Sequence, residues 1–114
     1  MTTSHLLQHF ANLGYEQKII LQEFNKPHTE NIFALNRPYL YTNSKLVKFD
    51  RDEWTMRPDI FCLDYYQVPY FYPIILMVNE LSSIFEFIPE NLYNSLIIAP
   101  DKVAIMNVLR QRAL

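Results

Sequence analysis

The side chains that could carry chemistry are few and lie far apart in the chain. His5 and His9 are four residues apart, a spacing that places two imidazoles on one face of a helix. A zinc site of this kind needs a third ligand, and no cysteine or carboxylate motif accompanies the pair. Asp59 and Asp64 are five residues apart and would not face each other on a helix, as acid–base catalysis by paired carboxylates requires. We therefore interpret the histidines as exposed polar residues and expect no metal site.

Nucleophiles and phosphate-binding loops are equally scarce. Cys62 is the only cysteine, so the chain cannot form an internal disulfide, and its apolar neighbours predict a buried, unreactive thiol. With one glycine, the chain cannot build a glycine-rich phosphate loop. No serine lies in a nucleophile motif. The sequence predicts a protein that is not an enzyme and has no cofactor.

Length and composition indicate one domain that works by binding. The chain has 114 residues, half of them hydrophobic, which is enough for one core. A net charge of −2 without a run of basic residues argues against nucleic acid as a partner. The N-terminus shows no signal-peptide pattern, and the longest apolar run, residues 73–78, is too short to span a membrane. The aromatic content, 15%, suits either a tyrosine-rich interface or a ring of tyrosines around a small core.

The N-terminal part, residues 1–49, is predicted to form a helix and a β-hairpin arm. Thr3 or Ser4 can cap a helix over residues 4–13, and Gly14 suits its end. Residues 15–24 fit a helix and a strand equally well. From residue 32 to residue 49 the pattern becomes strand-like, which predicts a hairpin or meander with Pro38 at an edge or in a loop.

Residues 50–100 are predicted to form the core of an α+β fold, followed by a C-terminal helix over residues 101–114. The pattern predicts a polar turn before a short strand at residues 54–56. Pro58 and Pro73 can each open a helix, the second with an apolar face that reaches Leu81 before Ser82 ends it. A strand at residues 96–98 is stopped by Pro100.

Several short motifs follow one another in this core: Arg57-Pro58-Asp59, Tyr65-Tyr66, the run from Pro73 to Asn79, Phe85-Glu86-Phe87 and Ile97-Ile98-Ala99-Pro100. In order and spacing they resemble the LysM-like module of baseplate wedge proteins of contractile-tailed bacteriophages. The resemblance covers about residues 50–100. It implies a strand–helix–helix–strand core, with the strands paired antiparallel and both helices on one face.

The resemblance also implies structural roles for single residues. Trp54 and Tyr66 would fill the core, while Arg57 and Asp59, around Pro58, would hold the corner where a strand leads into the first helix. Asn79 would brace the loop of residues 82–87, and a glycan contact through Asn79 is the alternative.

The chain departs from the family pattern at two turns. Family members commonly carry glycine where this chain has Gln67, and often Pro-Gly where it has Pro89-Glu90-Asn91. We expect these turns to use other geometry, with Asn91 or Asn94 in the left-handed conformation.

The implied function is that of a virion structural protein. It would be a baseplate wedge or tail-assembly component, made in the host cytoplasm and located in the tail, whose partners are other tail or baseplate subunits. The aromatic residues beyond the needs of a small core are the expected partner contacts: Tyr39, Tyr41, Tyr70, Phe71 and Tyr72. One alternative is a LysM-type module that binds peptidoglycan, a polymer containing N-acetylglucosamine. Another is a regulatory protein with a protein partner.

Overall fold

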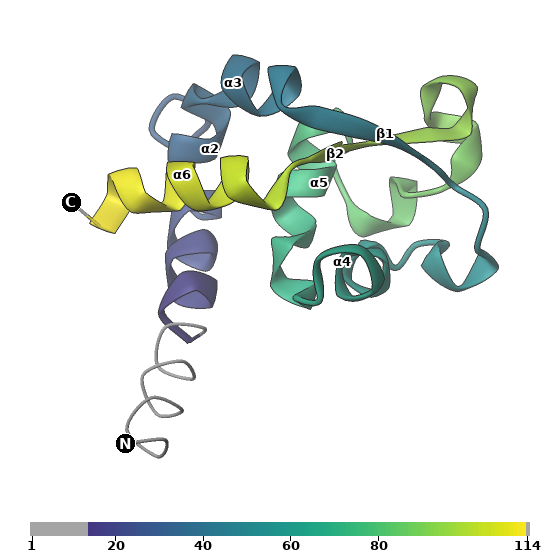
Figure 1. Ribbon diagram of the computed structural model, residues 1–114, viewed down its shortest axis with the longest axis horizontal. Helices are drawn as coiled ribbons and strands as arrows, with labels where there is room; N and C mark the ends of the chain where they lie inside the picture. The colour runs from purple at the N-terminus through teal and green to yellow at the C-terminus, as the bar shows by residue number, and fades with distance from the viewer. Residues whose placement is uncertain (1–13, 114) are drawn as a thin grey trace.

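The computed structural model describes residues 14–113, which form an α+β fold around a two-stranded antiparallel sheet (Figure 1). The predicted α+β class is therefore confirmed. The described part of the chain begins with a helix at residues 14–24. Its further helices and strands are α2 (Ile32–Leu35), α3 (Arg37–Thr42), β1 (Ser44–Lys48), α4 (Pro58–Tyr66), α5 (Tyr72–Val78), β2 (Leu96–Pro100) and α6 (Lys102–Ala113). Short 3₁₀ helices occupy Asp52–Trp54, Pro69–Phe71, Ile84–Glu86, Pro89–Asn91 and Tyr93–Ser95.

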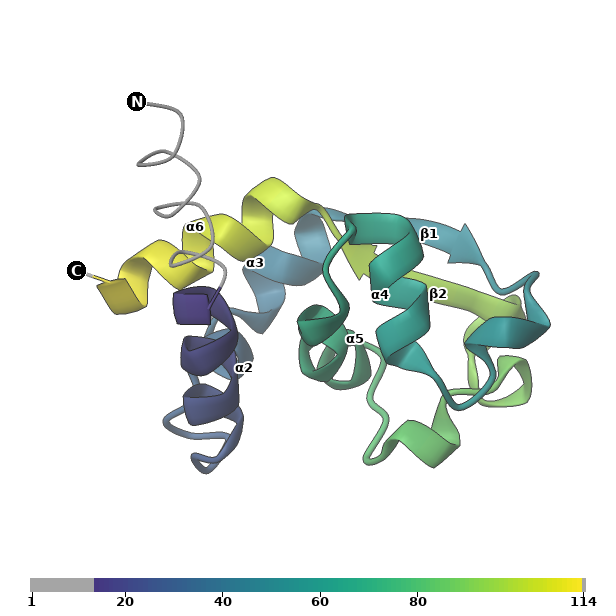
Figure 2. The same ribbon diagram turned by 90° about the horizontal axis from the view of Figure 1, so that it is seen from below.

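Strands β1 and β2 pair antiparallel with Leu46 opposite Ile98, and α4 and α5 connect them (Figures 1 and 2). Both helices lie on one side of the sheet, where Ile97 and Ala99 of β2 are fully buried. The sequence suggested a first strand at residues 54–56, but these residues do not form a strand. Met56 has a φ of 56°, which breaks an extended chain, and β1 lies before residue 50. The sheet therefore spans the predicted boundary between the arm and the core.

The predicted hairpin at residues 32–49 is wrong. A strand would place Phe33 and Leu35 on the same face, but Phe33 is fully buried and Leu35 is 60% exposed. The side chain of Asn31 accepts hydrogen bonds from the amides of Phe33 and Ala34 and so caps α2. Pro38 lies in the first turn of α3, where its missing amide costs nothing. Only the end of this stretch becomes the strand β1.

The ambiguous stretch before it is a helix over residues 14–24. Ile19, Ile20 and Glu23 are buried, a spacing that places them on one helical face. Gly14 is the first described residue of this helix and is itself helical, so it does not have the left-handed conformation expected at a helix end. The helix predicted over residues 4–13 lies outside the described residues. Every helix within residues 14–113 falls short of the length and apolar character that a membrane span requires.

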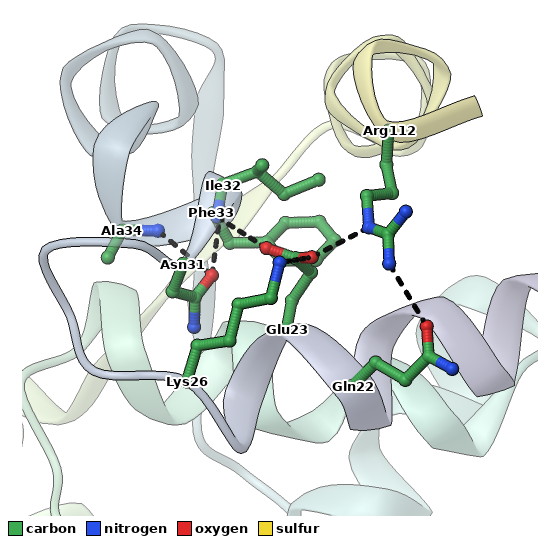
Figure 3. Close-up of polar contacts among 8 residues, drawn as sticks. All are labelled: Gln22, Glu23, Lys26, Asn31, Ile32, Phe33, Ala34 and Arg112. Carbon is green, nitrogen blue, oxygen red and sulfur yellow. Dashed lines mark hydrogen bonds and ion pairs between the residues drawn. The ribbon is translucent and has the colours of Figure 1, made fainter. Parts of the chain in front are cut away.

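The buried carboxylate of Glu23 joins three helices (Figure 3). It accepts hydrogen bonds from the Ile32 amide of α2 at 2.9 Å, from Arg112 Nε of α6 at 2.9 Å and from Lys26 Nζ at 2.7 Å. Burial alone would raise the pKa of Glu23, but these three donors together lower it below its ordinary value. Arg112 also donates to Gln22, which completes the link between the two ends of the described chain.

Aromatic rings form much of the core around α4. Trp54 packs edge-on against Phe61, with ring centroids 4.9 Å apart, and its Nε1 donates to Asp64 at 2.8 Å. Phe61 also packs edge-on against Tyr66, and Tyr66 against Phe71. All four rings are buried, so the structure places Trp54 and Tyr66 in the core.

Two helix ends use left-handed residues that are not glycine. Gln67, with a φ of 67°, ends α4, so the conformation that glycine would favour is kept at this turn. Glu80 has a φ of 60°, and the bonds from Leu81 N to Leu76 O and from Glu80 N to Met77 O form a Schellman motif. This motif ends α5 earlier than the predicted stop at Ser82. Asn94 also adopts the left-handed conformation, as expected, but Asn91 does not.

We expect Gln67→Gly to stabilise the protein by about 0.5–1 kcal/mol, because glycine removes the steric cost of the left-handed Cβ. The Gln67 side chain makes only long hydrogen bonds, at 3.3 and 3.4 Å, to the carbonyls of Asp64 and Tyr65. Urea denaturation followed by circular dichroism measures the change. Gln67→Ala is the control, since it loses the same bonds but keeps the Cβ. Equal stability of the two variants would contradict this explanation.

Candidate functional site

The expected partner contacts do not form one surface. Tyr39 and Tyr41 on α3 are 39% and 40% exposed. Phe71 is fully buried in the core and cannot contact a partner in this structure. Tyr70 is partly buried, and its hydroxyl donates to Glu16 at 2.9 Å, while Tyr72 is partly buried against the core. Burial raises the pKa of Tyr70, and the hydrogen bond to Glu16 raises it further.

Tyr41 lies at a groove that opens over the outer face of the sheet. The groove has a volume of about 310 Å³ and is lined mainly by apolar and aromatic side chains with a polar rim. We call it the outer-face groove, and its residues are Tyr41, Leu46, Asn79, Glu80, Asn91, Leu92, Tyr93, Leu96 and Ile98. Leu46 is 64% exposed and Tyr93 is 87% exposed. Large apolar side chains are therefore presented to solvent along one face of the sheet.

The pairing of the strands explains why these residues come together. Side chains alternate between the two faces of a sheet, and Leu46 lies opposite Ile98, so both point to the outer face. Ile97 and its inner-face neighbour Ala99 are buried beneath the helices. Leu46, Ile98 and Tyr93 were not among the contact residues expected from the sequence. The strand-like character at the end of residues 32–49 was the available signal, but it does not reveal which strand pairs with β1.

Asn79 holds the sheet and not the loop of residues 82–87, so the predicted brace is corrected. Its Nδ2 donates to the carbonyls of Ile75 at 2.8 Å and Ile98 at 3.0 Å. Its Oδ1 accepts from the amide of Ile98 at 2.9 Å. Both amide hydrogens and the carbonyl oxygen of this side chain are thus engaged, which leaves no free donor for a glycan.

Tyr66 acts on the same edge of β2. Its hydroxyl donates to the carbonyl of Pro100 at 2.6 Å. Burial raises the pKa of Tyr66, so the hydroxyl stays protonated and remains a donor. Together with Asn79, it closes the edge of β2 that faces away from β1.

Arg57 and Asp59 form an ion pair at the start of α4. Arg57 Nε and Nη2 lie 3.1 Å from the two carboxylate oxygens of Asp59, and the hydrogen bond from Arg57 lowers the pKa of Asp59. Pro58 is buried at the first position of the helix. The corner follows a 3₁₀ helix and a turn, not the strand that was predicted. The ion pair between Arg57 and Asp59 is solvent-exposed, so its contribution to stability is small.

Residues 14–113 contain neither an exposed thiol nor a cluster of metal-binding side chains. Cys62 is fully buried, and burial raises its pKa, so the thiol stays protonated. No cluster of three or more His, Cys, Asp or Glu side chains in this part of the chain could hold a metal ion. His5 and His9 lie outside the described residues. The outer-face groove is the candidate site for binding, because it presents exposed aromatic and apolar side chains to solvent.

Searches of protein-family models, curated proteins and solved structures find no match to this chain.

Proposed function

We propose that this chain is a virion structural protein of a tailed bacteriophage, a baseplate or tail component that acts through protein–protein contacts. The outer-face groove is the observation that carries the proposal. A surface on which Tyr41, Leu46 and Tyr93 are exposed side by side has the aromatic and aliphatic character of a protein interface. Such side chains anchor an interface when a partner excludes water from them.

The arrangement of the core supports the LysM-like part of the proposal. In the order β1–α4–α5–β2, two helices connect two antiparallel strands. The resemblance implies a core of this kind, although β1 lies before the residues 50–100 that the resemblance covers. The motif residues occur at element boundaries: Arg57 immediately before α4, Asn79 at the end of α5 and Pro100 at the end of β2. The proposed baseplate role rests on this architecture together with the outer-face groove.

Peptidoglycan binding is the second candidate. Tyr41 and Tyr93 flank the groove and could stack on sugar rings, and the Asn91 amide lies at its rim. Two observations weigh against this candidate. The Asn79 side chain is already fully engaged, and the Asn91 Nδ2 donates to the carbonyl of Glu86 at 3.0 Å. We therefore favour a protein partner.

The test is mass spectrometry of purified, nuclease-treated virions of the phage that encodes the chain, paired with a peptidoglycan pull-down of the recombinant protein. We expect the chain in the particle at a fixed stoichiometry and no retention on peptidoglycan. The double variant Leu46→Ser, Tyr93→Ser should fold but fail to enter the particle. Leu63→Ser is the matched control, because Leu63 is an exposed leucine of α4 that does not line the groove. Absence from particles together with saturable binding to peptidoglycan would overturn the proposal.

A further inference from the structure

The two outer edges of the sheet differ. The bonds from Phe49 N to Ser95 O at 3.0 Å and from Asp101 N to Asn43 O at 2.7 Å flank the ladder between β1 and β2. They show that odd-numbered residues of β1 direct their amide and carbonyl groups toward β2. In an antiparallel ladder these groups alternate in direction. Those of Leu46 and Lys48 therefore point away from β2.

The outer edge of β2 is closed, while that of β1 is open. On β2, Asn79 bonds to both backbone groups of Ile98, and Tyr66 bonds to the carbonyl of Pro100. On β1, no hydrogen bond among residues 14–113 reaches the amide or carbonyl of Leu46 or Lys48. Both side chains are exposed, and the sheet has no third strand within the described residues. An edge of this kind is a template for strand addition.

The charge of β1 indicates what such a strand carries. Lys45 and Lys48 are its only charged residues, and β2 has none. A second copy of β1 would bring four lysines together across the new edge, and like charges destabilise neighbouring strands. Asp50 and Asp52 lie beyond the end of β1. They would repel an acidic partner segment that extended past β1, so they limit the length of the segment but do not change the charge that β1 favours.

We propose that β1 receives a short, acidic, extended segment of a partner protein as a third strand. This inference rests on the proposed function and names the chemistry of the partner. Lys48 lies on the outer face with Leu46, while Lys45 lies on the opposite face with Val47. The complementary segment is therefore acidic–apolar–apolar–acidic, a pattern that reads the same in either strand direction. Its apolar side chain opposite Leu46 packs against Leu46 on the outer face of the sheet.

The probe is a capped peptide of sequence Thr-Glu-Val-Val-Glu-Thr, titrated into the full-length ¹⁵N-labelled protein. We expect saturable NMR shifts in β1, and slowed hydrogen exchange of the Leu46 and Lys48 amides. A peptide with lysine in place of glutamate should bind at least about tenfold more weakly. N-methylation of the peptide amides that face β1 should abolish binding, because it removes the donors of the new ladder.

Variants of Leu46 separate the backbone from the side chain. Leu46→Pro removes an amide that faces away from β2, so the ladder between β1 and β2 is kept and the peptide should no longer bind. Leu46→Ala keeps the amide and should weaken binding only a few-fold. If Leu46→Pro does not fold, the N-methylated peptide carries the same test.

Equal binding of the glutamate and lysine peptides, or binding that survives N-methylation, would overturn the inference. Failure of the glutamate peptide to bind would also overturn it. A dimer in sedimentation that Leu46→Pro disrupts would do the same, because it would show that another copy of the chain occupies this edge. None of these results bears on whether the protein is present in virions. Conversely, absence from virions with specific peptide binding would refute the proposed function and leave the strand addition standing.

Discussion

Asn79→Ala is expected to destabilise the protein by about 2–4 kcal/mol, because it leaves both backbone groups of Ile98 without a partner. The variant loses the bonds to Ile98 and the bond to the carbonyl of Ile75. No other strand lies beside β2 on that side, so nothing else in the described chain replaces them. Urea denaturation monitored by circular dichroism measures the change in the free energy of unfolding.

Asn91→Ala is the matched control, because Asn91 is an exposed asparagine with a single bond to the carbonyl of Glu86. We expect its cost to stay within about 0.5 kcal/mol, as for most surface substitutions. If both variants lose the same stability, the bonds of Asn79 to β2 are not what holds the strand.

Asn79→Asp tests the direction of the hydrogen bonds. The introduced carboxyl still accepts from the Ile98 amide, but when it is ionised it faces the carbonyls of Ile75 and Ile98, to which Asn79 now donates. Its pKa is therefore expected to lie above the value of about 3.9 for an unfolded aspartate. A raised pKa means that stability is retained below the unfolded pKa and lost as the pH rises through the folded pKa. The deficit relative to the parent protein should shrink as the pH falls from 7 toward 4.

Glu23→Gln is expected to cost about 2–3 kcal/mol, because it removes the charge that pairs with Lys26 and Arg112 inside the protein. The carboxylate is buried, whereas the two cations are partly exposed and can turn toward water, which keeps the cost at the lower end for a buried pair. The amide can still accept from Ile32, but its NH₂ group would face a cation. Gln22→Ala is the control, since it loses only the 3.2 Å bond to Arg112 and should change stability by less than about 0.5 kcal/mol.

The same substitution predicts a pH dependence. The pKa of Glu23 is lowered from its ordinary value of 4.5, so its contribution to stability is present above the unfolded pKa and lost as the pH falls through the folded pKa. The difference in unfolding free energy between the parent protein and Glu23→Gln should therefore shrink below pH 4.5. A difference that stays constant down to pH 2 would show that the charge of Glu23 does not stabilise the junction of the helices.

The sequence by itself determined the elements whose signals are local. Pro58 and Pro73 predicted the starts of α4 and α5, and Pro100 marked the end of β2, because a missing amide and a fixed φ act within a few residues. The apolar spacing after Asp101 likewise predicted α6. The absence of a glycine-rich loop and of a second cysteine also followed from composition alone.

Only the tertiary structure decided the sheet and the site. Residues 32–42 are rich in residues that suit strands, yet the burial of Phe33 and Leu40, together with the Asn31 cap, favours helices there. Leu46 and Ile98 are 52 positions apart in the chain, and nothing near either residue specifies the other as its partner. The outer-face groove, the open edge of β1 and the bonds from Asn79 to β2 exist only once the strands have paired. They depend on long-range packing, which local propensity does not encode.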